Sequence, residues 1–541
     1  MMTTNKKLIF PISLLIPLSL SAFDLQNDIR MLQASMDGSA RALIAPVVPI
    51  GIEKKSNKKF SGLENKRARP HALKESMDEM SGLTLLEKAE IFEKRTQEEH
   101  RPWFGLIVSK KYRDDGSLRV YSSLADSAIW TGNYIAAEAF RYAVTGEQDA
   151  LRSMEESLWG FHALHQITGG QGLIARVIIP AQYLEDHPKL KKERNPWVPG
   201  TGEFAGWIWQ GNLSHDQYNG YLFGVSNAWP YIKDTALRDA IREDVRQVGL
   251  HVIRNKMRIK TDDTHLDFRP NYAYQNQWPK ALRKTAMPPW FSGNPRSGIH
   301  LMLVVSHVTQ GPEFRQYYEE EMFIKRDMAF KMLDEPSVPN IASKYGKYAD
   351  KVLKSYSDED IKVTPEALYS SIGPDLAHRA LYDICRLESD PDAQALYRKV
   401  FKIRHDEIAN DKNTLWNFLY ASQFPDEKQA IWDGIDSLHR FIVRPIFGSV
   451  ENSSDPELEK HKGFKAEIFN TPPDEEDLKD TWFWVTPERL PFEKWAYHAP
   501  FAWQSNPFKM DGGSNLTQGS GAAYLVAYWL GRYHRFIDPT E

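Results

Sequence analysis

Apolar residues recur at helical spacing along most of the chain, and the helices that they predict come in pairs. The clearest pair joins residues 125–144 to residues 149–167 through a short turn. Gly146 in that turn is a typical helix stop. Two helices joined by so short a turn form an αα-hairpin.

The same pattern returns four more times along the sequence. The turns of these pairs are predicted at Lys233-Asp234, Gln310-Gly311-Pro312, Ser389-Asp390-Pro391 and Phe424-Pro425-Asp426. An amphipathic helix at residues 83–100 precedes the first pair, and an apolar helix at residues 519–536 ends the chain. If these two helices pair with each other, the chain has six helical pairs. Connections within pairs are short, whereas most connections between pairs are long.

This alternation predicts an all-α (α/α)6 toroid, a six-hairpin barrel in which six inner helices are surrounded by six outer ones. The aromatic-rich first helix of each pair is expected to be inner, and the long loops are expected to emerge at one end. Functional residues are commonly found on such loops. A helical solenoid is the alternative, but it requires repeats of similar sequence, and none is visible.

Composition and charge narrow the possible functions. The 541 residues are 42% hydrophobic and 12% aromatic, which is enough for a buried core. The net charge of −4 argues against a nucleic-acid partner. We find no P-loop, dinucleotide fingerprint or HExxH zinc motif, so no cofactor and no metal are expected. His162 and His165 have a spacing that permits metal binding, but packing histidines are more common.

The N-terminal residues resemble an export signal. Lys6 and Lys7 precede an apolar run at residues 8–20, and residues 1–21 are predicted to be a signal peptide. The run is too short to span a membrane comfortably, so no stable span is expected after cleavage. The mature protein is expected in the bacterial periplasm or outside the cell.

Residues 22–82 form a partly irregular segment with a basic tract, and the toroid is expected to occupy residues 83–541. The basic tract could bind a partner, although solvated charge runs are the commoner case. The lone Cys385 cannot form an internal disulfide and is interpreted as a small buried hydrophobic residue.

Candidate chemistry gathers where the predicted inner helices begin. Asp126 starts the first inner helix, and His215 and Asp216 start the second. Cleavage of a glycosidic bond needs one carboxyl group as acid and another as base or nucleophile. Asp126 could equally well be a simple N-cap. Asp216 is more suggestive, because the dense polar run SHDQYNGY opens an otherwise apolar helix.

The candidate residues fall into two groups. The predicted catalytic residues are Asp126, Asp216, His215 and Tyr218. The predicted substrate-binding residues are Trp130, Arg176, Trp207, Trp209, Arg269, Asn271, Tyr272, Trp503 and Gln504. Arg269 could bind an acidic sugar or merely pair with Asp267, and Arg176 has the same ambiguity.

Several motifs resemble those of exported bacterial proteins related to the six-hairpin glycosidase superfamily. They are DSAIWTGNYIAAEA with GLIAR, DQYNGYLFG, WQSNPF and YLVAYWLGRY, within residues 118–533. The resemblance implies an (α/α)6 barrel that acts on a polysaccharide or glycoconjugate. By motif match it implies a site lined by Asp126, Trp130, Arg176, Asp216 and Tyr218. Hydrolases and lyases share this barrel, so the fold does not choose between them.

The leading hypothesis is an exported carbohydrate-active enzyme, a glycoside hydrolase that uses Asp126 and Asp216 as its acid/base pair on a carbohydrate substrate. Which of the two is the acid stays open, as does the oligomeric state. One alternative is a polysaccharide lyase with Tyr218 or His215 as base and Arg176 or Arg269 neutralising a uronate. Another is a non-catalytic glycan-binding or envelope protein.

Overall fold

The structure is a computed structural model. It describes residues 82–192, 195–261, 264–267, 295–324, 372–441, 443, 447–456, 464–465, 484–486, 489–490 and 506–540. All of them belong to the larger of two units into which the chain divides, Val47–Glu541. The predicted signal peptide and the basic tract lie outside the described residues.

The described helices follow the predicted pairs. They are α5 (Ser127–Thr145) with α6 (Gln148–Gln166), α8 (His215–Ala228) with α9 (Thr235–Arg254), α10 (Pro295–Thr309) with α11 (Pro312–Gln316) and η8 (Tyr317–Ile324), α14 (Ile372–Leu387) with α15 (Pro391–Asp406), and α16 (Thr414–Ala421) with α17 (Lys428–Arg440). Helix α4 (Leu85–Glu99) contacts α19 (Ala522–Tyr533), which completes the sixth pair.

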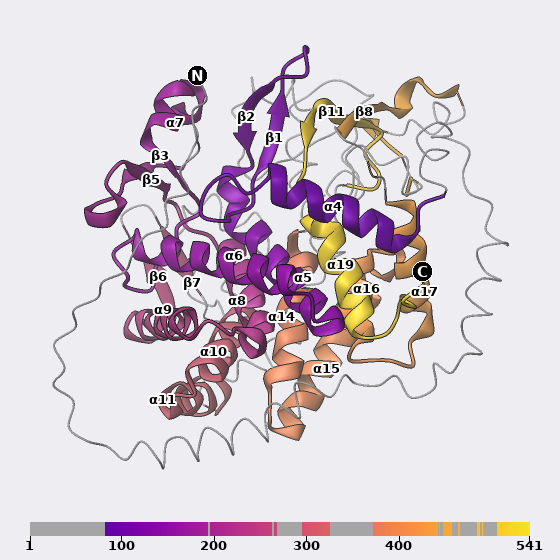
Figure 1. Cartoon of the computed structure of the whole chain (residues 1–541). Helices are drawn as coiled ribbons and strands as arrows, with labels where there is room; N and C mark the ends of the chain where they lie inside the picture. The colour runs from indigo at the N-terminus through magenta and orange to yellow at the C-terminus, as the bar shows by residue number, and fades with distance from the viewer. Residues whose placement is uncertain are drawn as a thin grey trace, which may run out of the picture. The chain divides into compact units, whose positions relative to one another are not determined.

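The first helices of the pairs form a closed ring with α19. Helix α5 contacts α8, α8 contacts α10, α10 contacts α14, α14 contacts α16, α16 contacts α19, and α19 returns to α5. Figure 1 shows α19 beside α4, α5 and α16, where the end of the chain meets its beginning. The predicted (α/α)6 toroid is confirmed.

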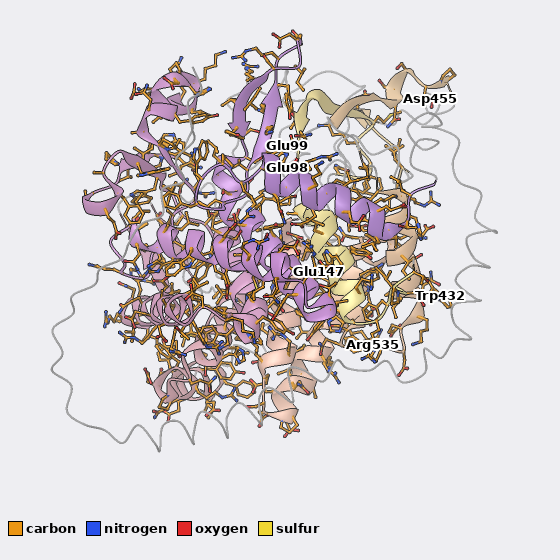
Figure 2. All side chains as sticks on the ribbon, viewed as in Figure 1. Glu98, Glu99, Glu147, Trp432, Asp455 and Arg535 are labelled. Carbon is orange, nitrogen blue, oxygen red and sulfur yellow. The ribbon has the colours of Figure 1, made fainter. Side chains whose placement is uncertain are left out.

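Burial distinguishes the inner helices from the outer ones. Every residue of α16 is buried, and so are the first ten residues of α19, whereas α6, α9 and α15 bury only one face. Side chains fill the spaces between the helices (Figure 2) and form one continuous apolar core. A second, smaller core includes Ile179 and Ile208, which belong to two of the strands described below.

Helices α5 and α8 approach unusually closely, because glycines line their contact. A Cβ atom added to Gly132 would lie 1.9 Å from the carbonyl oxygen of Gly220. One added to Gly220 would lie 2.4 Å from the Cα atom of Ile129. Glycine at these positions therefore allows α5, which follows Asp126, and α8, which begins at His215, to pack closely.

Short strands occupy connections that the sequence analysis treats as irregular loops. One sheet has the order β2 (Leu118–Ser122), β1 (Ser109–Tyr112), β11 (Asp511–Gln518), β8 (Phe447–Glu451), and a second has the order β3 (Ile178–Pro180), β5 (Trp207–Gln210), β4 (Trp197–Pro199). Two-stranded sheets join β6 (Arg258–Lys260) to β7 (His265–Asp267) and β9 (Phe464–Lys465) to β10 (Trp484–Val485). The described strand neighbours are antiparallel, and β1 pairs with β11 in the register Lys110↔Gln518.

Several short helical turns complete the described part of the chain. They are η2 (Leu124–Asp126), α7 (Ala181–Asp186), η3 (Pro188–Lys192), η4 (Gly202–Phe204), η5 (Trp229–Tyr231), η9 (Ala409–Asp411) and η10 (Asn452–Ser454). Cys385 on α14 is fully buried, as expected. Among the described residues, no helix combines the length and the apolar character needed to cross a membrane.

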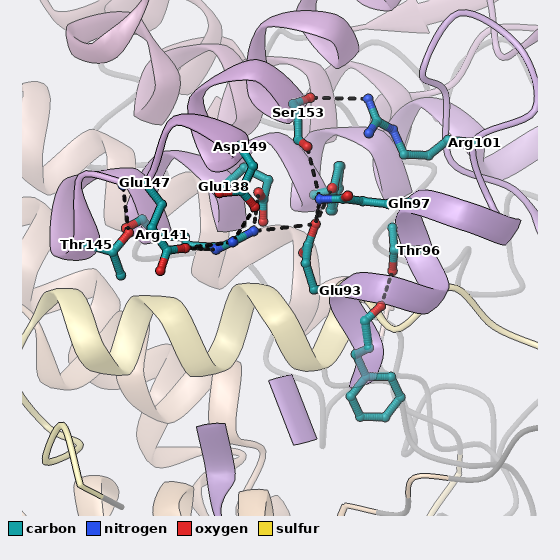
Figure 3. A network of polar contacts seen from close by, with 12 residues as sticks. Glu93, Thr96, Gln97, Arg101, Glu138, Arg141, Thr145, Glu147, Asp149 and Ser153 are labelled. Carbon is teal, nitrogen blue, oxygen red and sulfur yellow. Dashed lines mark hydrogen bonds and ion pairs between the residues drawn. The ribbon is translucent and has the colours of Figure 1, made fainter. Parts of the chain in front are cut away.

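A buried ionic network ties α4 to the first helical pair (Figure 3). The Arg141 guanidinium on α5 lies 3.2 Å from the Glu138 carboxylate and 2.5 Å from that of Asp149 on α6. It also lies 3.7 Å from Glu93 on α4, which accepts the hydroxyl of Tyr134 at 2.6 Å. The network therefore helps to close the ring.

Candidate functional site

Asp126 lies at the junction between η2 and α5 and is partly exposed to solvent. It occupies the N-cap position of α5, but its side chain makes no capping hydrogen bond. The capping explanation of this residue is therefore wrong in its usual form. The side chain is therefore available for another interaction at the start of α5.

Asp216 lies in the first turn of α8 and is also partly exposed. Its carboxylate accepts a hydrogen bond from the Ser214 hydroxyl group, and the backbone N–H groups of Asp216 and Gln217 also stabilise it. The positive end of the helix dipole adds to this stabilisation. These contacts favour the ionised form of Asp216, but burial outweighs them and raises its pKa above the usual value.

Arg176 holds the two helix starts together. Its Nε atom donates to the carbonyl oxygen of Asn212, before α8, at 2.6 Å. Its Nη1 atom donates to the carbonyl oxygen of Ala125, before α5, at 2.9 Å. The side chain of Gln217 donates to the same Ala125 oxygen at 3.0 Å. Arg176 is 8% exposed, so it acts largely inside the protein.

The two carboxyl groups differ in how strongly their charged forms are supported. Burial by the surrounding protein and the nearby Asp216 charge raise the pKa of Asp126 to about 7, against the opposing effect of Arg176. Burial also raises the pKa of Asp216, but Arg176 and the local hydrogen bonds oppose this rise. Asp126 therefore lacks the hydrogen bonds that limit the rise in the pKa of Asp216.

A third carboxyl group, Asp375, lies close by and was missed by the sequence analysis. It is fully buried in the first turn of α14 and forms an ion pair with Arg379 on the same helix. Its second oxygen accepts the indole N–H of Trp416 on α16 at 3.2 Å. Arg379 donates to Asn219 on α8 at 3.0 Å and to Asn133 on α5 at 2.9 Å. Four inner helices therefore meet at this ion pair.

The other predicted catalytic residues take different places. His215 begins α8 and is partly exposed. Tyr218 is fully buried, its hydroxyl donates to the carbonyl oxygen of Gly172, and it accepts the N–H of Ile174, each at 3.2 Å. Burial also raises the pKa of Tyr218. These contacts give Tyr218 a structural role, and we leave it out of the proposed catalytic pair.

The predicted aromatic contacts are partly taken up by packing. Trp130, Trp207 and Trp209 are half-buried and pack against the main core. The Trp207 ring lies 4.7 Å from the ring of Phe104. Their predicted contact with substrate stays a prediction. Arg269, Asn271, Tyr272, Trp503 and Gln504 lie outside the residues that the structure describes.

The histidine pair on α6 has a carboxylate partner. His162 and His165 each place Nδ1 at 2.7 Å from an oxygen of Asp244 on α9. The Nε2 atom of His165 accepts the backbone N–H of Gly172 at 2.9 Å. These contacts join α6, α9 and the following loop. Within the described ranges, no group of three or more metal-binding side chains comes together.

Comparisons with known proteins add little to this site. No protein-family model and no curated protein matches the sequence. Among solved structures, an unsaturated glucuronyl hydrolase specific for heparin is similar, with a TM-score of 0.35 and 10% identity over 83% of this chain and 96% of that chain. At that level the similarity assigns neither a family nor an activity. The fold stated above follows from the helix contacts of this chain.

Proposed function

We propose that this protein is a carbohydrate-active enzyme that hydrolyses glycosidic bonds, with Asp126 as the general acid and Asp216 as the base or nucleophile. The observation that carries the proposal is the asymmetry of two neighbouring carboxyl groups at the starts of α5 and α8. Pairs of titratable groups whose surroundings separate their pKa values are typical of acid/base sites.

The assignment of roles follows from the environment of each group. Asp126 has no capping hydrogen bond and a pKa of about 7, so it can hold a proton for the leaving oxygen. Burial raises the pKa of Asp216, but Arg176, hydrogen bonds and the helix dipole limit this rise, and we assign it the role of the anion. Arg176 maintains the relative position of the two through the backbone of both helix starts.

A panel of polysaccharides and glycoconjugates tests this function, with new reducing ends as the readout. We expect the wild-type protein to cleave at least one of them. Asp126→Asn and Asp216→Asn should each lose about 100-fold or more in turnover while remaining folded. The matched control is Asp239→Asn, which changes an exposed carboxylate on the outer helix α9 and should retain full activity.

A synthetic aryl glycoside separates the two roles. A good leaving group needs little protonation, so Asp126→Asn should recover much of its rate on this substrate, whereas Asp216→Asn should not. An ultraviolet-absorbing unsaturated uronate among the products would instead identify a lyase. Glycan binding that survives both substitutions, without turnover by the wild-type protein, would identify a non-catalytic binding protein.

We also propose that the protein is exported, on the basis of its signal-like residues 1–21. Fractionation of cells that express the full-length chain tests this. The expected product is a shortened protein in the periplasm or medium. Full-length protein confined to the cytoplasm contradicts the proposal.

A further inference from the structure

The buried ion pair lies next to Asp216 along helix α8. Asp216 and Asn219 are three residues apart and therefore share one face of the helix. Arg379 donates to Asn219, which brings its positive charge to the same face of α8 as Asp216. Asn219 in turn donates to the carbonyl oxygen of Leu376 at 3.1 Å, so α8 and α14 are held in register.

The ion pair joins four inner helices, and its charges can have a second effect beyond this structural role. Both side chains are fully buried, and removal of two charges from water costs several kcal/mol per ion before pairing. Apolar residues of similar volume commonly hold helices together equally well. In such an interior, a charge acts strongly on any carboxylate nearby. The charges of Asp375 and Arg379 both interact with that of Asp216, in addition to the stronger effect of Arg176. Burial raises the pKa of Asp375 to about 7, so its charge is only partly present below neutral pH.

We propose that Arg379 and Asp375 are a positioning pair that sets the ionisation of Asp216. Arg379 supplies a buried positive charge that favours the Asp216 carboxylate, and Asp375 moderates this charge. The inference rests on the proposed function, in which Asp216 must be ionised to act as base or nucleophile. Neither member of the pair touches solvent, so both act through Asp216 and not on substrate.

Other charged or titratable groups lie on the same helix as Asp216 or on the elements next to it. Asp126 approaches from the start of α5, and Arg176 approaches from the loop before β3. His215 precedes it on α8, and Arg296 begins the neighbouring helix α10. All four stay unchanged in the variants below. A change in Asp216 therefore reports on the pair.

Infrared titration of the full-length protein measures the protonation of Asp216 directly. The protonated-carboxyl band is followed against pH, and the spectrum of Asp216→Asn is subtracted. The spectrum of Asp126→Asn serves as a second reference, because loss of the Asp216 charge also shifts Asp126. In Asp375→Asn the Arg379 charge is balanced at no pH, so the midpoint of Asp216 should fall, by less than about one pH unit because Asp375 is itself partly protonated below its pKa of about 7. Addition of Arg379→Gln removes that charge, and the midpoint should rise again by at least as much.

The control is a second buried ion pair on the same helix. Asp383 accepts hydrogen bonds from Arg386 and His300, about two turns further along α14. Asp383→Asn should affect stability without a shift of the Asp216 midpoint.

If Asp375→Asn does not fold, Trp416→Phe takes its place. It removes a hydrogen bond that supports the Asp375 charge and should lower the midpoint by a smaller amount.

The outcomes separate this inference from the proposed function, because the infrared readout needs no substrate. A midpoint that shifts as stated without cleavage of any glycan supports the inference and overturns the function. Cleavage of a glycan with an unchanged Asp216 midpoint, in whichever of Asp375→Asn and Trp416→Phe folds, overturns the inference alone. On a cleaved substrate, the acidic limb of kcat/KM should move to lower pH in Asp375→Asn.

Discussion

One methyl group added at Gly132 tests the close contact that sets α5 and α8 side by side. The new Cβ atom would lie 1.9 Å from the Gly220 carbonyl oxygen and 2.4 Å from its carbon, whereas ordinary contact begins near 3.4 Å. These are backbone atoms, which cannot rotate away, so the helices must separate by roughly 1 Å or more. Overpacking of this kind typically costs 1–3 kcal/mol, and the backbone obstacle places Gly132→Ala at about 3 kcal/mol.

The matched control is Gly373→Ala on the inner helix α14, where a Cβ atom meets nothing within 4 Å. Alanine favours a helix over glycine by up to about 1 kcal/mol, but Gly373 precedes Pro374, which disfavours a helical alanine there, so this control should cost much less than Gly132→Ala. Urea denaturation followed by tryptophan fluorescence measures both. Equal stability of Gly132→Ala and the wild-type protein would refute the close packing of α5 on α8. We also expect Gly132→Ala to lose activity while still folded, because α5 and α8 carry the candidate carboxylates.

Further substitutions test the ring closure and the structural assignments. Burial, and after it the charge of Glu93, raises the pKa of Glu138 well above its usual value. The stability that the proton of Glu138 provides is therefore present at low pH and lost as pH rises through this raised pKa. At alkaline pH, Glu138→Gln should therefore have a higher melting temperature than the wild-type protein. The control Glu90→Gln changes an exposed carboxylate and should not raise the melting temperature. Equal melting temperatures of Glu138→Gln and the wild-type protein at all pH values would contradict the prediction. Lys88 on α4 is buried and donates to two backbone carbonyl groups at the end of α17, at 2.7 and 3.2 Å. Lys88→Met should therefore lower the free energy of unfolding, measured by urea denaturation, by about 2–3 kcal/mol. An unchanged free energy of unfolding would disprove this connection between α4 and α17. Tyr218→Phe should keep turnover within a few-fold and lose about 1 kcal/mol of stability; a 100-fold loss of turnover at normal stability would make Tyr218 a base.

The helical pairs could be predicted from sequence because their signals are local. Apolar periodicity and turn residues such as Gly146 identify each helix from its own neighbourhood. The strands lack such signals, since β1 pairs with β11 although Lys110 and its partner Gln518 lie far apart in the chain. Only the closed ring brings these segments together.

The candidate site was partly visible in the sequence. Asp126 and Asp216 stand where apolar helices begin, and helix starts can be predicted. Asp375 was missed because no helix start was predicted beside it. The structure describes α14 from Ile372, and the adjacent Gly373-Pro374 is a helix-start signal that could have found it.

Some features depend on side-chain geometry and had no sequence signal. Whether Asp126 caps its helix is decided by the orientation of its side chain, which the sequence does not state. The partners of Arg379 come from α5, α8 and α14, and only the folded ring assembles them.

The dependence of kcat/KM on pH tests the central claim most directly, on the first glycan that the panel identifies. If Asp126 is the general acid, activity should fall on the alkaline side with a midpoint of about 7, because the acid must be protonated. Asp126→Asn should remove this limb from the residual activity. An alkaline limb near pH 7 that persists unchanged in Asp126→Asn would contradict the assignment.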